Sequence, residues 1–141
     1  MGTSHHQDES LNKEAIMIFG IGTDIVEIQR IEKIFSKFNN RFAKKILSKK
    51  EYEAFQISNA PAHFLAKRFA AKEAVAKALG LGFRDPISFH GIEVDHNDLG
   101  APFFKFNAEI SKFLDQKKIN KCHLSISDEK NIASAFVILE V

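Results

Sequence analysis

Residues 61–80 read PAHFLAKRFAAKEAVAKALG, and this stretch has the pattern of one long helix. Pro61 suits a first helical turn, and Gly80 suits the position just past the last turn. Ser58 and Asn59 precede the stretch and are candidate N-terminal caps. Between the two ends, strong helix formers predominate and apolar residues recur at helical spacing. We therefore expect this helix to be the element on which the rest of the fold packs.

The same stretch carries a cluster of charged residues. They are Lys67, Arg68, Lys72, Glu73 and Lys77, four cations around one carboxylate. Glu73 and Lys77 are four residues apart, which places them on one side of a helix. Such a pair is most often a solvated surface ion pair. A functional site would need a second acid elsewhere in the chain and a phosphate-bearing ligand for the cations.

Asp24 is a candidate for that second acid. It interrupts the apolar run IMIFGIGTDIVEI at residues 16–28, which predicts a β-strand. Aspartate is disfavoured in strands. Asp24 is therefore either a turn residue, a buried carboxylate whose hydrogen bonds are satisfied, or a ligand. Gly20 and Gly22 lie in the same run without the third glycine of a dinucleotide-binding motif. They indicate instead either a β-bulge or the close approach of another backbone to the strand.

Composition limits the class of protein. The chain has 141 residues, of which 45% are hydrophobic and 27% charged, as in a single globular domain. We expect residues 1–16 to be a leader or a vector-derived extension, and residues 17–141 to be the domain. No apolar run suggests a signal peptide or a membrane span, and a lone cysteine fits the cytoplasm. The net charge of +2 is too weak to imply nucleic acid by itself.

Hydrophobic periodicity predicts further short elements around the long helix. We expect helices at 27–38, 41–47, 49–55 and 107–116, and strands at 87–94, 103–106, 123–127 and 132–141. Basic residues are densest between positions 30 and 50, either as a solvated face or as a docking surface for an acidic partner.

Three segments in this order resemble one known family. They are GIGTDIVEI at 20–28, FLAKRFAAKEAVAKALGLG at 64–82 and LSISDEKNIASAFVIL at 124–139. The chain is similar to bacterial holo-[acyl-carrier-protein] synthases, the short, single-domain group of phosphopantetheinyl transferases. The resemblance implies an α+β fold in which a small antiparallel sheet packs on one long central helix with additional short helices. It also implies a homotrimer with coenzyme sites at subunit interfaces.

The resemblance further implies a reaction. The family transfers the 4′-phosphopantetheine of coenzyme A to a serine of apo acyl carrier protein and releases adenosine 3′,5′-bisphosphate. This transfer supports fatty acid biosynthesis, and Mg²⁺ is the usual metal. The family's acids fall on Asp24 and Glu73, which would bind the metal, and its lysine falls on Lys77. Glu73, acting through a water, and Lys77 would be catalytic.

We expect Arg68 and Lys72 to lie with Lys77 on the face that carries Glu73, where all three cations would bind the coenzyme. The acyl carrier protein is acidic, and Arg30 and Arg41 fall where family members use arginines to dock it. Asp128 stands where many relatives have a histidine. We assign no role to Asp128 or to His123, the first residue of the predicted strand at 123–127.

Two other functions remain open from the sequence. A basic nucleic-acid-binding domain would explain the lysines near position 45, but it would leave Asp24 and Glu73 without a purpose. A module that binds coenzyme A or a nucleotide without catalysis would keep the cationic helix but make both acids incidental.

Overall fold

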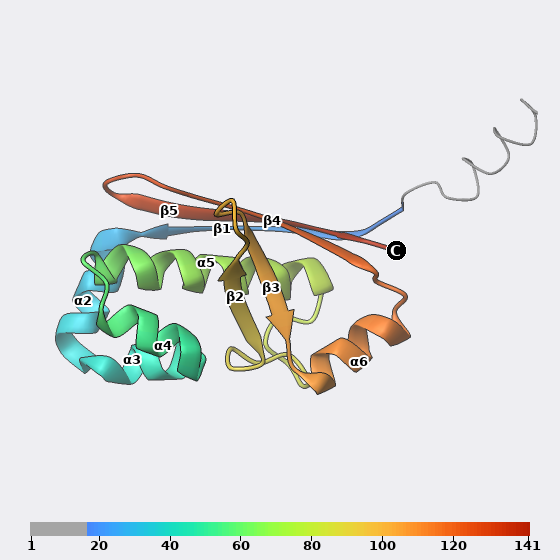
Figure 1. Cartoon of the computed structure of the whole chain (residues 1–141), viewed down its shortest axis with the longest axis horizontal. Helices are drawn as coiled ribbons and strands as arrows, with labels where there is room; N and C mark the ends of the chain where they lie inside the picture. Colours follow the sequence, from blue (N-terminus) through green and yellow to red (C-terminus); the bar gives the residue numbers. More distant parts are fainter. Residues whose placement is uncertain (1–16) are drawn as a thin grey trace, which may run out of the picture.

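The longest helix, α5 (Pro61–Leu79), lies under a three-stranded antiparallel sheet (Figure 1). The computed structural model describes residues 17–141. The predicted leader, residues 1–16, lies outside the described residues, so the division of the chain at residue 17 stays a prediction. The strand order in the sheet is β1 (Ile18–Glu27), β5 (Ile132–Glu140), β4 (Lys121–Asp128).

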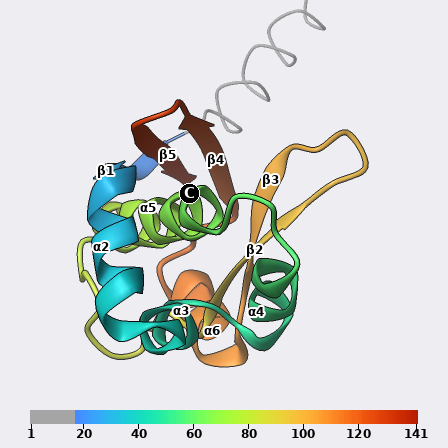
Figure 2. The ribbon, with the colours of Figure 1, turned by 90° about the vertical axis from the view of Figure 1, so that its left-hand side faces the viewer.

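A separate antiparallel hairpin and four short helices complete the α+β fold. The hairpin pairs β2 (Ile92–His96) with β3 (Pro102–Phe106), and α6 (Ala108–Gln116) follows it. The other helices are α2 (Ile28–Phe38), α3 (Asn40–Ile46) and α4 (Lys49–Gln56). Viewed along α5, α3 and α4 lie on the side away from the sheet, and α2 flanks the long helix (Figure 2). None of the helices in residues 17–141 is long and apolar enough to cross a membrane.

Two glycines let β1 and α5 pack backbone against backbone. A Cβ atom on Gly22 would overlap the carbonyl oxygen of Ala74, and it would lie 2.8 Å from the amide nitrogen of Ala78. A Cβ atom on Gly20 would overlap the carbonyl oxygen of Ala78. The close approach expected from these glycines is therefore confirmed, and it brings the strand that carries Asp24 directly against the helix that carries Glu73.

The two faces of the sheet differ sharply in burial. On the face toward α5, alternate residues of β1 and β5 form the core, including Val26, Ala135 and Val137. The opposite face exposes large apolar side chains of the same two strands. These are Ile18, Phe19, Ile21, Ile25, Ile132 and Phe136. An exposed apolar face of this kind is typical of an interaction surface.

Two local predictions are wrong. The strand expected at 87–94 begins only at Ile92, because residues 87–91 form a turn in which the Gly91 amide donates to Ser88 Oγ. The N-terminal cap of α5 is Ala60, with no side-chain cap. Ser58 Oγ accepts a hydrogen bond from the Ala60 amide instead, so it closes the turn before the helix.

Candidate active site

Asp24, Glu73 and Lys77 form one cluster between β1 and α5. Asp24 pairs in register with buried Ala135, so its side chain shares the sheet face that packs on the helix. The Lys77 ammonium donates to Asp24 Oδ1 at 3.0 Å and to the carbonyl of Thr23 at 3.0 Å. Glu73 lies one helical turn before Lys77, on the same side of α5. The structure thus brings Asp24 of β1 together with two residues of α5, of which Lys77 lies 53 positions away in the chain.

The charges in this cluster do not balance. Burial raises the pKa of Glu73 above its ordinary value, and the nearby charge of Asp24 raises it further. Lys77 and Arg30 oppose both effects but do not cancel them. The two carboxyl groups therefore lie close enough to repel each other, and a bound cation would relieve that repulsion.

The donor set fits Mg²⁺ better than Zn²⁺. No group of three or more His, Cys, Asp or Glu side chains that could hold a metal occurs in residues 17–141. A structural zinc site would need such a group. Mg²⁺ is commonly held by one or two carboxylates, with waters and substrate phosphates as the remaining ligands. Asp24 and Glu73 provide that minimal set of oxygens.

The pKa of Glu73 predicts how stability depends on pH in the absence of a divalent cation. Because the pKa is raised on folding, the native state binds the proton more tightly than the unfolded chain does. The contribution of Glu73 to stability should therefore fall as pH rises from its ordinary value of 4.5 through its folded pKa. Thermal unfolding in EDTA across this range measures it. The melting-temperature difference between wild type and Glu73→Gln should widen as pH rises; a constant difference would contradict the shift.

Lys72 does not lie on the Glu73 face, and that expectation is wrong. Its side chain is fully buried. The ammonium donates to Glu51 Oε1 at 2.6 Å and to the carbonyls of Ile46 and Phe89 at 2.7 and 3.1 Å. Lys72 is one residue from Glu73, about 100° around the helix, so the two side chains diverge. With all three N–H donors engaged by the protein, Lys72 has none left for a coenzyme.

Arg68 lies one turn before Lys72 and shares its side of α5, so it also lies off the Glu73 face. Its Nε is 3.2 Å from Glu51 Oε2, an ion pair without hydrogen-bond alignment, and its guanidinium stacks 4.2 Å above the Phe64 ring. Burial lowers the pKa of Arg68, and the charge of Glu51 opposes that shift. Arg68 lines a cavity of about 340 Å³. Its predicted contact with the coenzyme stays a prediction.

Glu51 is the buried residue that sequence reasoning missed. Glu51 forms a capping box with Ser48 at the start of α4. The same carboxylate, 2% exposed, also accepts from Lys72 and from the Val94 amide. These partners lie 21 and 43 positions away, so no local pattern could have indicated them.

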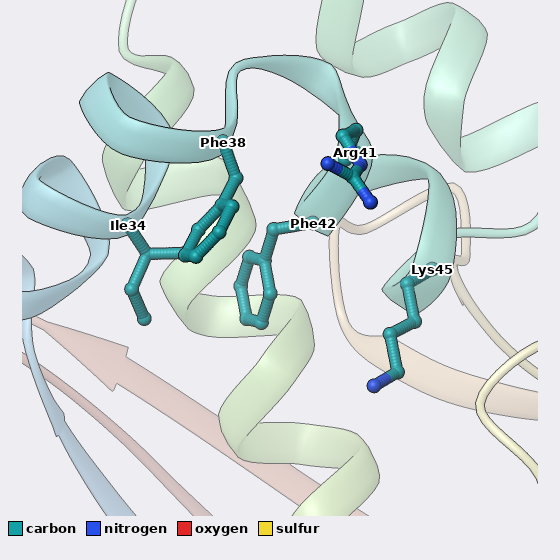
Figure 3. Close-up of a pocket in the computed structure, with 5 residues that line it drawn as sticks. All are labelled: Ile34, Phe38, Arg41, Phe42 and Lys45. Atoms are coloured by element: carbon teal, nitrogen blue, oxygen red, sulfur yellow. The ribbon is translucent and has the colours of Figure 1, made fainter.

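The two arginines predicted to dock a partner are both exposed on the basic helices. Arg30 lies on α2, and its charge acts on Glu73. Arg41 and Lys45 of α3 line a pocket of about 420 Å³ with apolar residues from α2 and α3 (Figure 3). The apolar residues are Ile34, Phe38 and Phe42. The surface thus combines positive charge with an apolar floor, as partner-binding surfaces do.

The residues left unassigned have ordinary partners. Asp128 lies 4.0 Å from Lys67, and His123 lies 3.0 Å from Glu140 on the exposed face of the sheet. The acidic turn after β2 is explained by turn chemistry. Asn97 Oδ1 accepts from two amides there.

Comparison with known proteins places this geometry in a family. Residues 20–136 match the model of the 4′-phosphopantetheinyl transferase superfamily. A holo-[acyl-carrier-protein] synthase of Nitrosospira multiformis is 52% identical over 124 residues, which cover 88% of this chain and 99% of the relative.

Solved structures of the same family resemble this fold. A holo-[acyl-carrier-protein] synthase of Neisseria meningitidis superposes with a TM-score of 0.86 at 46% identity, covering 89% of this chain and 100% of the other. One of Bacillus anthracis, in complex with CoA (3′,5′-ADP), superposes with a TM-score of 0.73 at 39% identity, covering 89% and 98%. The chain therefore belongs to the 4′-phosphopantetheinyl transferase superfamily and, within it, to the holo-[acyl-carrier-protein] synthases.

Proposed function

We propose that this protein transfers the 4′-phosphopantetheine group of coenzyme A to a serine of apo acyl carrier protein, a step that supports fatty acid biosynthesis. The observation that carries the proposal is the cluster of Asp24, Glu73 and Lys77, found in a chain whose relatives are holo-[acyl-carrier-protein] synthases. Neither alternative function needs a carboxylate on β1 whose charge acts on a second carboxylate on α5.

The reaction forms one P–O bond and breaks another. The serine oxygen of the carrier protein attacks the phosphorus that bears pantetheine. The bond from that phosphorus to the bridging oxygen of the diphosphate breaks, and adenosine 3′,5′-bisphosphate leaves with the electron pair. Glu73 takes the serine proton through a water, for which its raised pKa suits it. Lys77 donates to the oxygen on which charge develops.

Asp24 and Glu73 would hold Mg²⁺, because they are two adjacent carboxylates with excess negative charge. When bound, the metal supplies positive charge that neutralises the diphosphate. Lys77 fixes the orientation of Asp24 through its hydrogen bond to Oδ1. Phosphoryl transfer depends mainly on such positioning and charge neutralisation.

We further propose a homotrimer with coenzyme sites at the subunit interfaces, acting in the cytoplasm. The exposed apolar face of β1 and β5 supports the association of copies. The Arg68 cavity and the Asp24–Glu73–Lys77 cluster belong to different sides of α5, which supports a coenzyme that contacts two subunits. A single cysteine is compatible with a reducing compartment.

One assay tests the activity. The protein is incubated with coenzyme A, Mg²⁺ and an apo acyl carrier protein, and the mass of the carrier protein is measured by mass spectrometry. A mass gain of one phosphopantetheine supports the transferase. Coenzyme binding without a mass gain would favour the non-catalytic module, and nucleic-acid binding alone would favour the nucleic-acid-binding domain.

Docking of the carrier protein should depend on charge. Arg41→Glu should raise the KM for the carrier by roughly tenfold at low salt and weaken its dependence on ionic strength, because charge attraction across an exposed surface is screened by salt. Steady-state kinetics at two salt concentrations measure both effects. Lys117→Glu at the end of α6 makes the same change in net charge elsewhere. Equal effects of the two variants would contradict docking on α3.

A further inference from the structure

We propose that Glu51 is a positioning residue for coenzyme binding: it holds the Arg68 guanidinium toward the adjoining cavity, where Arg68 binds a phosphate of the coenzyme. The inference rests on the proposed function, and it concerns a residue that makes no contact with the ligand itself. If the proposal holds, the buried hydrogen bonds of Glu51 in α4 influence the affinity for coenzyme A.

Glu51 is fixed from several elements at once. Its Oε1 accepts from the Ser48 amide at 2.8 Å and from Lys72 at 2.6 Å. Its Oε2 accepts from the Val94 amide of β2 at 2.9 Å and lies 3.2 Å from Arg68 Nε. A buried carboxylate that accepts three hydrogen bonds and pairs with a guanidinium has little freedom to move. It is therefore a rigid support for Arg68.

The guanidinium of Arg68 contacts Glu51 through its Nε edge, and the Arg68 side chain also lines the cavity. Glu51 engages its Nε edge, and the Phe64 ring supports the flat face of the guanidinium. The side chain is only 11% exposed, yet it lines the cavity. Within residues 17–141, the acidic partner of this guanidinium is Glu51, which it approaches through Nε. A guanidinium oriented in this way presents two parallel N–H donors, which match a phosphate.

The cavity is suited to an anion. Lys67, Arg68 and His96 line it, and Asp128 is the one acid there, 4.0 Å from Lys67. Burial lowers the pKa of His96, and the charges of Arg68 and Lys67 lower it further, although Asp95 opposes them. The lining is therefore net positive even with His96 neutral. A coenzyme A phosphate, either the 3′-phosphate or the diphosphate, has the matching chemistry.

A variant of Lys72 distinguishes a role of Glu51 in positioning Arg68 from a role in the stability of the fold alone. The Lys72 ammonium binds Oε1 of Glu51, whereas Arg68 pairs with Oε2, and Lys72 is not among the residues that line the cavity. Removing Lys72 would leave the ion pair between Glu51 and Arg68 in place. Removing Glu51 would release Arg68 and leave two buried cations unpaired. Both changes destabilise the fold, but only the second should affect coenzyme binding.

The test is the KM for coenzyme A against kcat in three variants. Glu51→Gln should raise the KM by roughly tenfold with kcat changed by less than about threefold. Lys72→Met should lower the melting temperature but change the KM by less than about twofold. Glu53→Gln is the matched control, an exposed glutamate on the same helix, and should change neither. If Glu51→Gln does not fold, Glu51→Asp, which retracts the carboxylate from Arg68, should show the same KM effect in smaller measure.

A second arm asks whether Glu51 acts through Arg68. The KM increase in Arg68→Met and in Arg68→Met combined with Glu51→Gln should be nearly the same, because one interaction is removed in both. Repeating the series with 3′-dephospho-coenzyme A locates the phosphate. Loss of the Glu51 effect assigns it to the 3′-phosphate, and an equal effect assigns it to the diphosphate; either supports the positioning role.

Two results would overturn the proposal. One is a folded Glu51 variant with a wild-type KM for coenzyme A, and the other is additive KM increases for Glu51→Gln and Arg68→Met. Absence of transfer by the wild-type protein would be a different failure, that of the proposed function.

Discussion

Replacing Glu73 with glutamine is expected to reduce kcat by roughly 10³-fold, within the range for loss of a general base, while the protein stays folded. Glutamine keeps the size of the side chain but cannot take the serine proton, and it removes one of two proposed metal ligands. The fold should not suffer, because the ionised Glu73 carboxylate is disfavoured by burial and by the charge of Asp24. In EDTA at neutral pH the variant should melt at the same temperature as the wild type or higher.

Mass spectrometry of the carrier protein measures the loss of transfer, and thermal unfolding measures stability in the same samples. Glu109→Gln, in the exposed first turn of α6, controls for removal of a carboxylate elsewhere. Near-normal kcat for Glu73→Gln would refute both proposed roles of Glu73. A variant that loses activity and also melts well below the wild type would contradict the charge repulsion between Glu73 and Asp24.

The features that could be predicted from sequence are those encoded locally. Residues within α5 are strong helix formers, Pro61 stands in its first turn and Gly80 adopts the left-handed conformation after its last. The capping box of α4 and the Asn107 cap of α6 likewise use residues three positions apart. The turn at 87–91 was missed because its apolar residues, such as Ile87, satisfy a strand pattern equally well.

The site was harder to predict because its contacts are long-range. The meeting of Asp24 with Glu73 was expected from the family resemblance, and the glycines of β1 gave the physical reason that strand and helix approach so closely. Lys72 was misplaced because four cations on one helix were treated as one face, although side chains at 72 and 73 diverge by about 100°. Burial of a lysine could not be predicted without its acceptor, Glu51.

The largest effect expected on the fold is that of Gly22→Ala. A single methyl group at this position would overlap the carbonyl oxygen of Ala74 and lie 2.8 Å from the Ala78 nitrogen. Both atoms belong to the backbone of α5, so no side-chain rotation can relieve the clash. Overpacking of this kind costs about 3 kcal/mol or more, and chemical denaturation should show it as a loss of unfolding free energy.

Relief of the clash requires β1 and α5 to separate, and the proposed catalytic cluster lies across that contact. Asp24 is two residues from Gly22 on the strand, while Glu73 and Lys77 lie on the helix. Displacement by about 1 Å commonly costs about 100-fold in rate, so the fraction that still folds should be correspondingly slow. Ala74→Gly should not rescue Gly22→Ala, because the contact is with a carbonyl oxygen that glycine retains. Rescue by Ala74→Gly, or a Gly22→Ala protein of wild-type stability and rate, would show that β1 and α5 are not in backbone contact.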